Sequence, residues 1–188
     1  MVDQADFTDL DALRAEFEIL SNAPYIPDLD RIGWVFRAYT ANANALIQHI
    51  RYPHEDPNLV NQMRMPGENP QLYIEYQSEL LRQMRNYCAT AAVLIEHSRQ
   101  MMGKLAATNP EVVANYERHK AKVVELPVAH FIKDLRNYMI HYSLPSTGSS
   151  VSYTAEDNQV TLDIFLSSSE LLKWSKWTQQ SKAYRLCP

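Results

Sequence analysis

The chain has 188 residues, 46% hydrophobic and 21% charged, a balance that is ordinary for one soluble globular domain with a well-buried core. The formal charge of −4 at pH 7 excludes a protein that coats nucleic acid nonspecifically, because such proteins need clustered lysine and arginine. A small basic cleft remains compatible with this charge. Only four glycines occur, which favours helices over a turn-rich β-sandwich.

The sequence lacks the features of export and of membrane insertion. The acidic start, Met1 to Asp6, does not have the basic-then-apolar order of a signal peptide, and no apolar run approaches the ~20 residues needed to span a bilayer. We therefore expect a cytoplasmic protein without a membrane partner. The two cysteines, Cys88 and Cys187, define neither a disulfide framework nor a zinc site, and Cys88 is expected to be a buried, inert thiol.

The first half of the chain predicts helices by its three- and four-residue apolar spacing. A first helix is expected near residues 8–21, where one stripe contains Leu10, Leu13, Phe17 and Leu20. Pro27 is expected to keep the next link extended, before a second helix that begins near residues 28–30 and runs to about 50. Residues 52–70 contain four prolines and predict a long connection, with one turn near residues 59–63. The longest helix follows, from Gln71 to about Gly103.

The second half predicts two more helices and then a change of period. One helix starts at Pro110, and Pro127 kinks or restarts the chain before a helix over 127–142. Alternating apolar residues on both sides of a turn at 156–158 predict a β-hairpin. The string from Ser167 to Glu170 has the spacing of a capping box and predicts a last helix through about Tyr184. The expected architecture is mainly α: a helical bundle over 1–145, with the hairpin and final helix of 146–188 packed on it.

The segment from Phe131 to His141 concentrates reactive side chains in an apolar helix. Asn137 and His141 are four residues apart and therefore lie on one face, and Lys133 extends the row by a turn. Arg136 starts further round the axis, but its long side chain can reach back toward the row. Arginine can hold a charged phosphate oxygen, histidine can move protons near neutral pH, and asparagine can orient either group.

The string Arg136-Asn137-x3-His141 resembles the Arg-polar-x3-His motif of the HEPN superfamily (higher eukaryotes and prokaryotes nucleotide-binding). The members are small helical-bundle proteins, and many are metal-independent ribonucleases. The motif covers residues 136–141, and the wider resemblance, a helical body with this motif late in the chain, covers residues 29–145. The resemblance implies a HEPN-like bundle whose site is built at a homodimer interface. It also implies a role in toxin–antitoxin, antiphage or RNA-processing systems.

These observations predict a metal-independent endoribonuclease that acts on single-stranded RNA as a homodimer and needs no cofactor. The expected catalytic residues are Arg136, Asn137 and His141, and the expected substrate-binding residues are Lys133, Tyr138 and Tyr142. The resemblance also allows a partner protein such as an antitoxin. No spacing typical of a metal site occurs among the histidines.

A second interpretation stays open, because some HEPN proteins have lost activity and serve as nucleotide-binding or protein-interaction modules. In that case His141 simply complements the dipole at the end of its helix. Arg136 would then form a surface salt bridge with Asp134 or Glu125.

Overall fold

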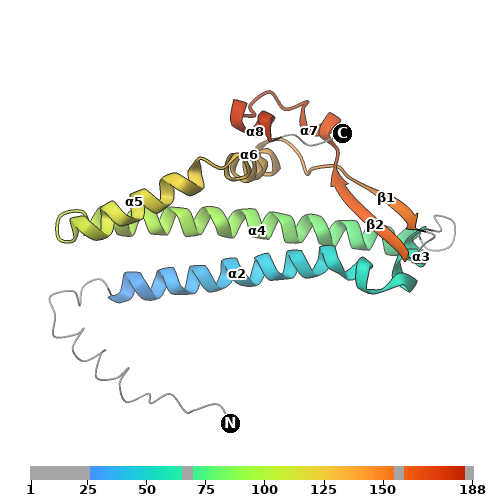
Figure 1. Cartoon of the computed structure of the whole chain (residues 1–188), viewed down its shortest axis with the longest axis horizontal. Coiled ribbons are helices and arrows are strands. Elements are labelled where there is room, and N and C mark those ends of the chain that lie inside the picture. The colour runs from blue at the N-terminus through green and yellow to red at the C-terminus, as the bar shows by residue number, and fades with distance from the viewer. Residues whose placement is uncertain (1–25, 65–69, 155–158, 185–188) are drawn as a thin grey trace, which may run out of the picture.

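A computed structural model describes residues 26–64, 70–154 and 159–184. Two long antiparallel helices form its base, α2 (Ile26–Glu55) and α4 (Pro70–Leu105), joined through the short helix α3 (Pro57–Arg64) (Figure 1). After α4, the chain forms α5 (Pro110–Val124) and α6 (Pro127–His141). The strands β1 (Thr147–Thr154) and β2 (Gln159–Leu166) follow, and then the short helices α7 (Ser168–Leu171) and α8 (Gln179–Ala183). The described residues are mainly helical, as the sequence predicts.

Prolines set many of the helix boundaries. Four helices begin with one, at positions 57, 70, 110 and 127. Proline is well suited to a first turn, because its missing N–H would have no partner inside the helix and its φ is already close to the helical value. Pro27 likewise lies in the first turn of α2, so the prediction of an extended link at this residue is wrong.

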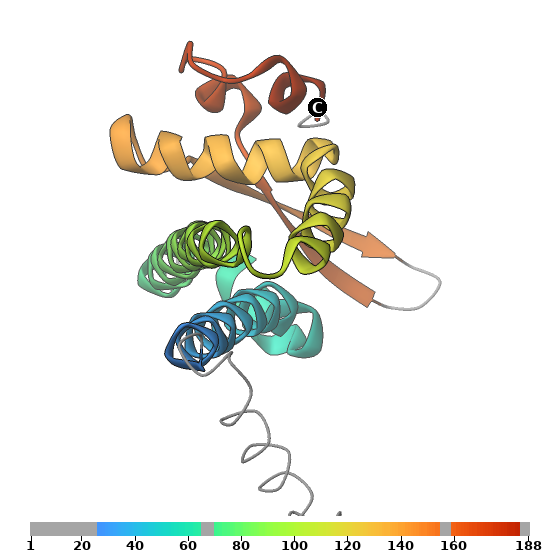
Figure 2. The same cartoon turned by 90° about the vertical axis from the view of Figure 1, so that its left-hand side faces the viewer.

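The elements stack in layers when the molecule is viewed along α2 and α4 (Figure 2). Helix α6 crosses over α4, on the side away from α2, and the two short C-terminal helices cover α6 (Figure 2). A buried cluster holds these layers together and comprises Cys88 of α4, four residues of α6 and three from the C-terminal segment: Phe131, Leu135, Tyr138, Met139, Leu171, Trp174 and Trp177. This packing fixes the orientation of α6 and therefore of the motif.

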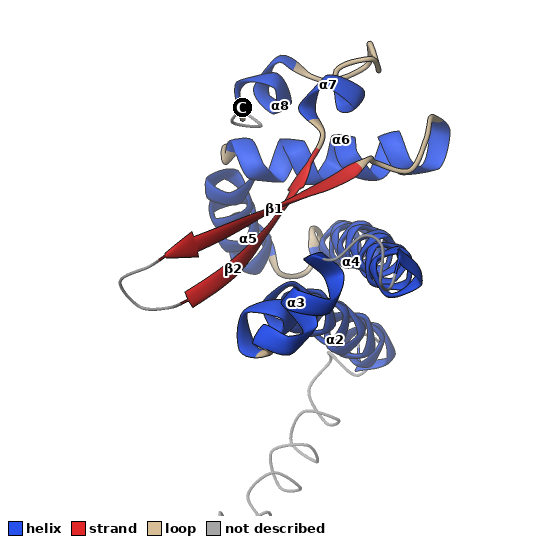
Figure 3. Cartoon of the chain, turned by 90° about the vertical axis from the view of Figure 1, so that its right-hand side faces the viewer, coloured by secondary structure: helices blue, strands red, loops and turns tan. Residues whose placement is uncertain are grey.

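The hairpin pairs β1 with β2 in antiparallel register, from Thr147 opposite Leu166 to Thr154 opposite Gln159, which confirms the predicted hairpin. It runs from the layer of α6 and α7 toward α3 (Figure 3). There Leu162 of β2 joins a second buried cluster with Val60, Met63 and Tyr76. No other strand occurs in the described residues, and Arg136 to His141 are helical throughout, as predicted. The expected turn at 156–158 and the expected helix at 8–21 lie outside the described residues.

The predicted connection over 52–70 is wrong in its first part, because α2 continues through Pro53 to Glu55 and α3 follows directly. A proline inside a helix deprives the carbonyl four residues earlier of its N–H partner. Here that carbonyl belongs to His49, and the Tyr76 hydroxyl donates to it at 2.9 Å. The imidazole of His49 in turn lies 3.0 Å from the Tyr76 carbonyl oxygen. The α2–α4 contact therefore compensates for the lost hydrogen bond.

The single predicted last helix is also wrong, because the chain breaks between α7 and α8. The break has a tertiary cause at Thr178, whose backbone N–H donates to the Asp134 carboxylate at 2.8 Å instead of to a helical carbonyl. The Trp177 indole N–H donates to the Leu171 carbonyl at 2.6 Å and satisfies the end of α7. At the start of α7, Ser167 makes no side-chain cap, so the predicted capping box does not form.

Candidate functional site

Helix α6 presents the motif on its outer side. Its inner residues join the buried cluster, whereas Lys133, Ile140 and His141 are exposed and Asn137 is half-buried. Positions 133, 137, 140 and 141 recur at three- and four-residue intervals and therefore share one face of the helix. Arg136 is half-buried at the edge of this face. We refer to Lys133, Arg136, Asn137, Ile140 and His141 together as the motif face.

Arg136 is a half-buried cation without a carboxylate partner among the described residues. Its Nη1 donates to Asn137 Oδ1 over 3.4 Å, a long hydrogen bond, and its buried Nε has no acceptor among the residues that the structure describes. A buried donor without a partner costs about 1–3 kcal/mol, and more when it is charged. The guanidinium therefore has unused capacity to bind an anion.

Of the two carboxylates expected beside Arg136, Glu125 forms no ion pair with it and Asp134 faces the opposite way. Asp134 is only 3% exposed and accepts hydrogen bonds from the Thr178 backbone N–H, the Thr178 hydroxyl and the Ser181 hydroxyl at 2.7–2.8 Å. Burial alone would raise the pKa of this carboxyl, but the bonds from Ser181 and Thr178 outweigh it and hold the pKa below its ordinary value. Asp134 is the only acidic residue of α6. The motif face therefore carries basic side chains, and α6 contributes no carboxylate to it, although the net charge of the whole chain is negative.

His141 occupies the last turn of α6, and its imidazole is open to solvent. Within the described part of the chain, no hydrogen bond joins it to Asn137 or Arg136. The structure thus places Asn137 and His141 on one face, as predicted, and the described residues contribute no hydrogen bond that orients the imidazole. The nearby thiol is inert: burial raises the pKa of Cys88 to about 11, with the charge of Arg136 acting in the opposite direction.

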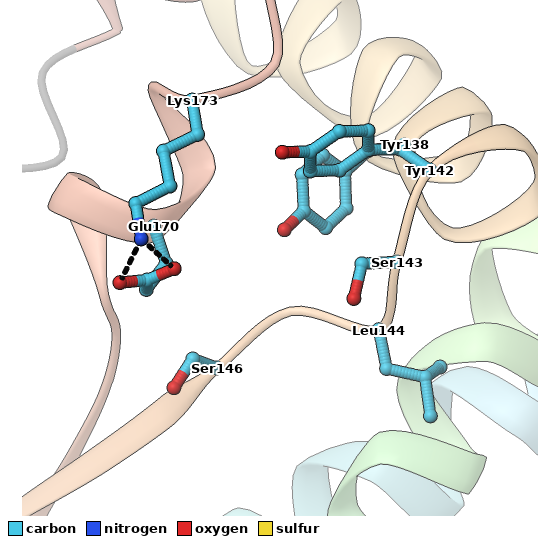
Figure 4. Close-up of a pocket in the computed structure, with 7 residues that line it drawn as sticks. All are labelled: Tyr138, Tyr142, Ser143, Leu144, Ser146, Glu170 and Lys173. Carbon is cyan, nitrogen blue, oxygen red and sulfur yellow. Dashed lines mark hydrogen bonds and ion pairs between the residues drawn. The ribbon is translucent and has the colours of Figure 1, made fainter.

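A shallow pocket of about 460 Å³ lies beyond the end of α6 (Figure 4). Among the predicted site residues, Tyr138 and Tyr142 line it, together with Ser143, Leu144, Ser146, Glu170 and Lys173. The hydroxyls of both tyrosines point toward the Glu170–Lys173 ion pair, whose Oε2 and Nζ are 2.7 Å apart (Figure 4). The remaining predicted residues, Lys133, Arg136, Asn137 and His141, do not line this pocket.

The two tyrosines differ in what they can contact. Tyr138 is 2% exposed and is packed between Trp174, Trp177 and Tyr142, with ring centroids 5.2–5.8 Å apart, and burial raises its pKa. Because Tyr138 is almost fully buried, its ring face cannot stack on a base. Tyr142 is 52% exposed and keeps a ring available. Glu170 and Lys173 were missed as pocket residues, although their three-residue spacing on a helix indicates a pair.

Two further properties bear on the kind of site. No group of three or more His, Cys, Asp or Glu side chains in the described residues could hold a metal ion. In the same part of the chain, no helix combines the length and apolar character that a membrane crossing requires. Comparison of the chain with protein-family models, with curated proteins and with solved structures finds no match.

Proposed function

We propose that this chain is a HEPN-like protein whose motif face binds an RNA phosphodiester and cleaves it, without a metal ion, at a site formed by two copies of the chain. The observation that carries the proposal is Arg136, a half-buried guanidinium with a buried, unpartnered Nε and no carboxylate partner among the described residues. A phosphate group against the guanidinium would supply the missing negative charge.

The chemistry follows from the side chains of the motif face. One His141 imidazole removes the proton from the 2′-hydroxyl, whose oxygen attacks the adjacent phosphorus in line. The bond to the 5′-oxygen breaks, a second imidazole protonates this leaving oxygen, and a 2′,3′-cyclic phosphate remains. Arg136 stabilises the charge that develops on the non-bridging oxygens, and Asn137 orients the guanidinium through its Oδ1.

Each chain has only one imidazole on its motif face, so acid and base together require two chains. A two-fold axis beside α6 would bring together two copies of His141 and of Arg136. Ile140 supports this assembly, because it lies between the polar residues of the face and is 50% exposed. Leu126, just before α6, is 49% exposed. Apolar residues open to water beside a polar motif are typical of an interface.

A non-catalytic nucleotide-binding or interaction module is the second candidate. The observation that favours it is the exposed His141, for which the described residues provide no orienting hydrogen bond. In this case Arg136 would still bind a phosphate, but no bond would be broken.

The test is cleavage of single-stranded RNA by purified protein in the presence of EDTA. The proposal predicts products with a cyclic phosphate and no cleavage of DNA, which lacks the 2′-hydroxyl. His141→Ala and Arg136→Ala should each lower the rate by roughly 10²-fold or more. The matched controls are His119→Ala and Arg118→Ala, exposed neighbours on α5, which should leave the rate unchanged.

Three outcomes separate the alternatives. RNA binding that requires Arg136, without any cleavage by the wild-type protein, would establish the non-catalytic module. Melting temperatures several degrees lower in both motif variants, with neither binding nor cleavage by the wild-type protein, would make the motif structural. Cleavage that disappears with EDTA would contradict the metal-free mechanism.

A further inference from the structure

The pocket beyond the end of α6 is lined by a charged pair that the proposed chemistry does not use. Glu170 lies in α7, and Lys173 follows that helix. Leu171 and Trp174, their neighbours in sequence, belong to the buried cluster. Packing therefore fixes the backbone of this segment, while the two charged side chains line the pocket (Figure 4). We call Glu170 and Lys173 the pocket pair.

The surroundings of the pocket pair differ from those of a similar ion pair on α5. There Lys120 Nζ lies 2.6 Å from a Glu117 oxygen and 5.6 Å from the centre of the Tyr116 ring, but these residues do not line the pocket. The hydroxyls of Tyr138 and Tyr142, by contrast, point toward the pocket pair (Figure 4). Polar groups that converge on a pocket of about 460 Å³ are typical of small-molecule sites, which measure about 300–1,000 Å³.

The charges of the pocket pair favour one RNA base. Both oxygens of Glu170 accept from Lys173 Nζ at 2.7 Å, and the two side chains are 44% and 59% exposed. An exposed ion pair contributes little stability, so a ligand with two adjacent N–H groups can displace the ammonium from the carboxylate. Guanine has such groups, N1–H beside the N2 amino group, and its O6 next to N1 can accept from the displaced ammonium. Adenine and cytosine have an amino group next to an acceptor nitrogen, and uracil has one N–H between two acceptors.

Tyr142 supplies a surface for the face of the base. Its side chain is 52% exposed, and it lines the pocket together with the pocket pair. Unpaired RNA bases stack on exposed aromatic rings while their edges form hydrogen bonds. Tyr142 directly follows His141 in the chain. A base in the pocket and a phosphate at the motif face can therefore belong to neighbouring nucleotides.

We infer that the pocket binds a guanine base, with its N1 and N2 edge on Glu170 and its ring on Tyr142. The inference rests on the proposed function for the source of this base, a nucleotide next to the phosphate that Arg136 holds. It makes guanine-containing single-stranded RNA the preferred substrate. A free guanine mononucleotide offers the same edge, and the experiment separates the two sources.

Binding of RNA analogues that cannot be cleaved tests the inference apart from the catalytic step. The probes are fluorescent 2′-O-methyl uridine oligonucleotides with one central guanine or with inosine, which lacks the N2 amino group. Fluorescence polarisation in EDTA should show about tenfold tighter binding of the guanine probe, the size expected for one hydrogen bond to a charged group. Glu170→Gln should remove this difference. Glu117→Gln, which changes the matching ion pair on α5, is the control and should keep it.

Two further positions separate stacking from phosphate binding. Tyr142→Ala should weaken both probes by about fivefold or more, whereas Tyr142→Phe should bind them like the wild type, because stacking requires only the ring. Arg136→Ala should weaken both probes equally and keep the guanine preference, because a phosphate contact does not read the base. Wild-type melting temperatures would show that the variants are folded.

Equal affinity for the guanine and inosine probes, or a preference that survives Glu170→Gln, would overturn the inference. The proposed function would still stand in that case if Arg136→Ala weakened both probes. A guanine preference that requires Glu170, with binding that does not depend on Arg136, would instead support the pocket and contradict the proposed phosphate site. Binding of guanosine 5′-monophosphate as tightly as the guanine probe would overturn the assignment of the pocket to RNA.

Discussion

Replacement of Asp134 tests the contact that positions the C-terminal segment on α6. All three hydrogen bonds to this carboxylate end on Oδ2, from the Thr178 N–H and hydroxyl at 2.8 Å and from the Ser181 hydroxyl at 2.7 Å. Asp134→Ala removes the acceptor and leaves the Thr178 N–H without a partner. Asp134→Asn keeps the shape and a neutral acceptor but removes the charge.

The structure sets the size of the effect. A hydrogen bond to a charged group contributes about 1.5–3 kcal/mol, but three bonds on one oxygen do not add, and the two hydroxyls can still bond to each other at 2.8 Å. We expect the free energy of unfolding to fall by about 3 kcal/mol for Asp134→Ala and by about 1 kcal/mol for Asp134→Asn. In a chain of this size these losses correspond to roughly 6–12 °C and 2–4 °C of melting temperature.

Urea unfolding followed by tryptophan fluorescence measures this change, because Trp174 and Trp177 lie in the segment that Asp134 holds. The folded-state pKa of Asp134 lies below its ordinary value of 3.8, so its stabilising contribution is present above that pH and is lost as the pH falls through the folded-state pKa. The difference between wild type and Asp134→Asn should therefore shrink at low pH. Asp163→Asn, on the exposed side of β2, is the control. A loss for Asp134→Ala no larger than that of the control, or a difference that is the same at pH 7 and pH 3, would refute the reasoning.

Two other predictions concern packing. Leu171→Ala should lower the free energy of unfolding by about 2–5 kcal/mol, because Leu171 is 0% exposed. The control Leu172→Ala, at 60% exposure, should change it by less than about 0.5 kcal/mol. Equal losses for the two variants in chemical denaturation would contradict the assigned core. Tyr76→Phe should cost about 1–3 kcal/mol, because it removes the donor to the carbonyl that the proline of α2 leaves without a partner. A melting temperature equal to that of wild type would show that this carbonyl needs no protein partner.

The periodic spacing of apolar residues was sufficient to predict much of the fold. The apolar spacing of α4 and α6 and the alternation in the hairpin depend on neighbouring residues alone, and the structure confirms them. The continuation of α2 through Pro53 depends on Tyr76, and the break before α8 depends on Asp134, both distant in sequence. Local patterns cannot report such tertiary partners. The assignment to the HEPN superfamily remains a prediction.

Of the candidate site, too, only the features that depend on local spacing could be predicted from the sequence. The four-residue spacing of Asn137 and His141 was enough to place them on one face of α6. That Arg136 has no carboxylate partner among the described residues could not be predicted, because Asp134 is only two residues away in sequence and the fold turns it toward Thr178. The burial of Tyr138 likewise depends on Trp174 and Trp177, which follow the hairpin.

The most direct test of the central claim measures assembly and cleavage on the same samples. Sedimentation gives the dimer fraction across a range of protein concentrations, and an RNA-cleavage assay in EDTA gives the rate per chain at each concentration. The composite site predicts that the rate per chain rises in proportion to the dimer fraction. It also predicts that Ile140→Asp, which places a charge in the motif face but spares Arg136, Asn137 and His141, abolishes both dimer and cleavage. A monomer that cuts RNA at the full rate would contradict the two-chain mechanism, and a stable dimer that never cuts RNA would contradict the enzymatic function.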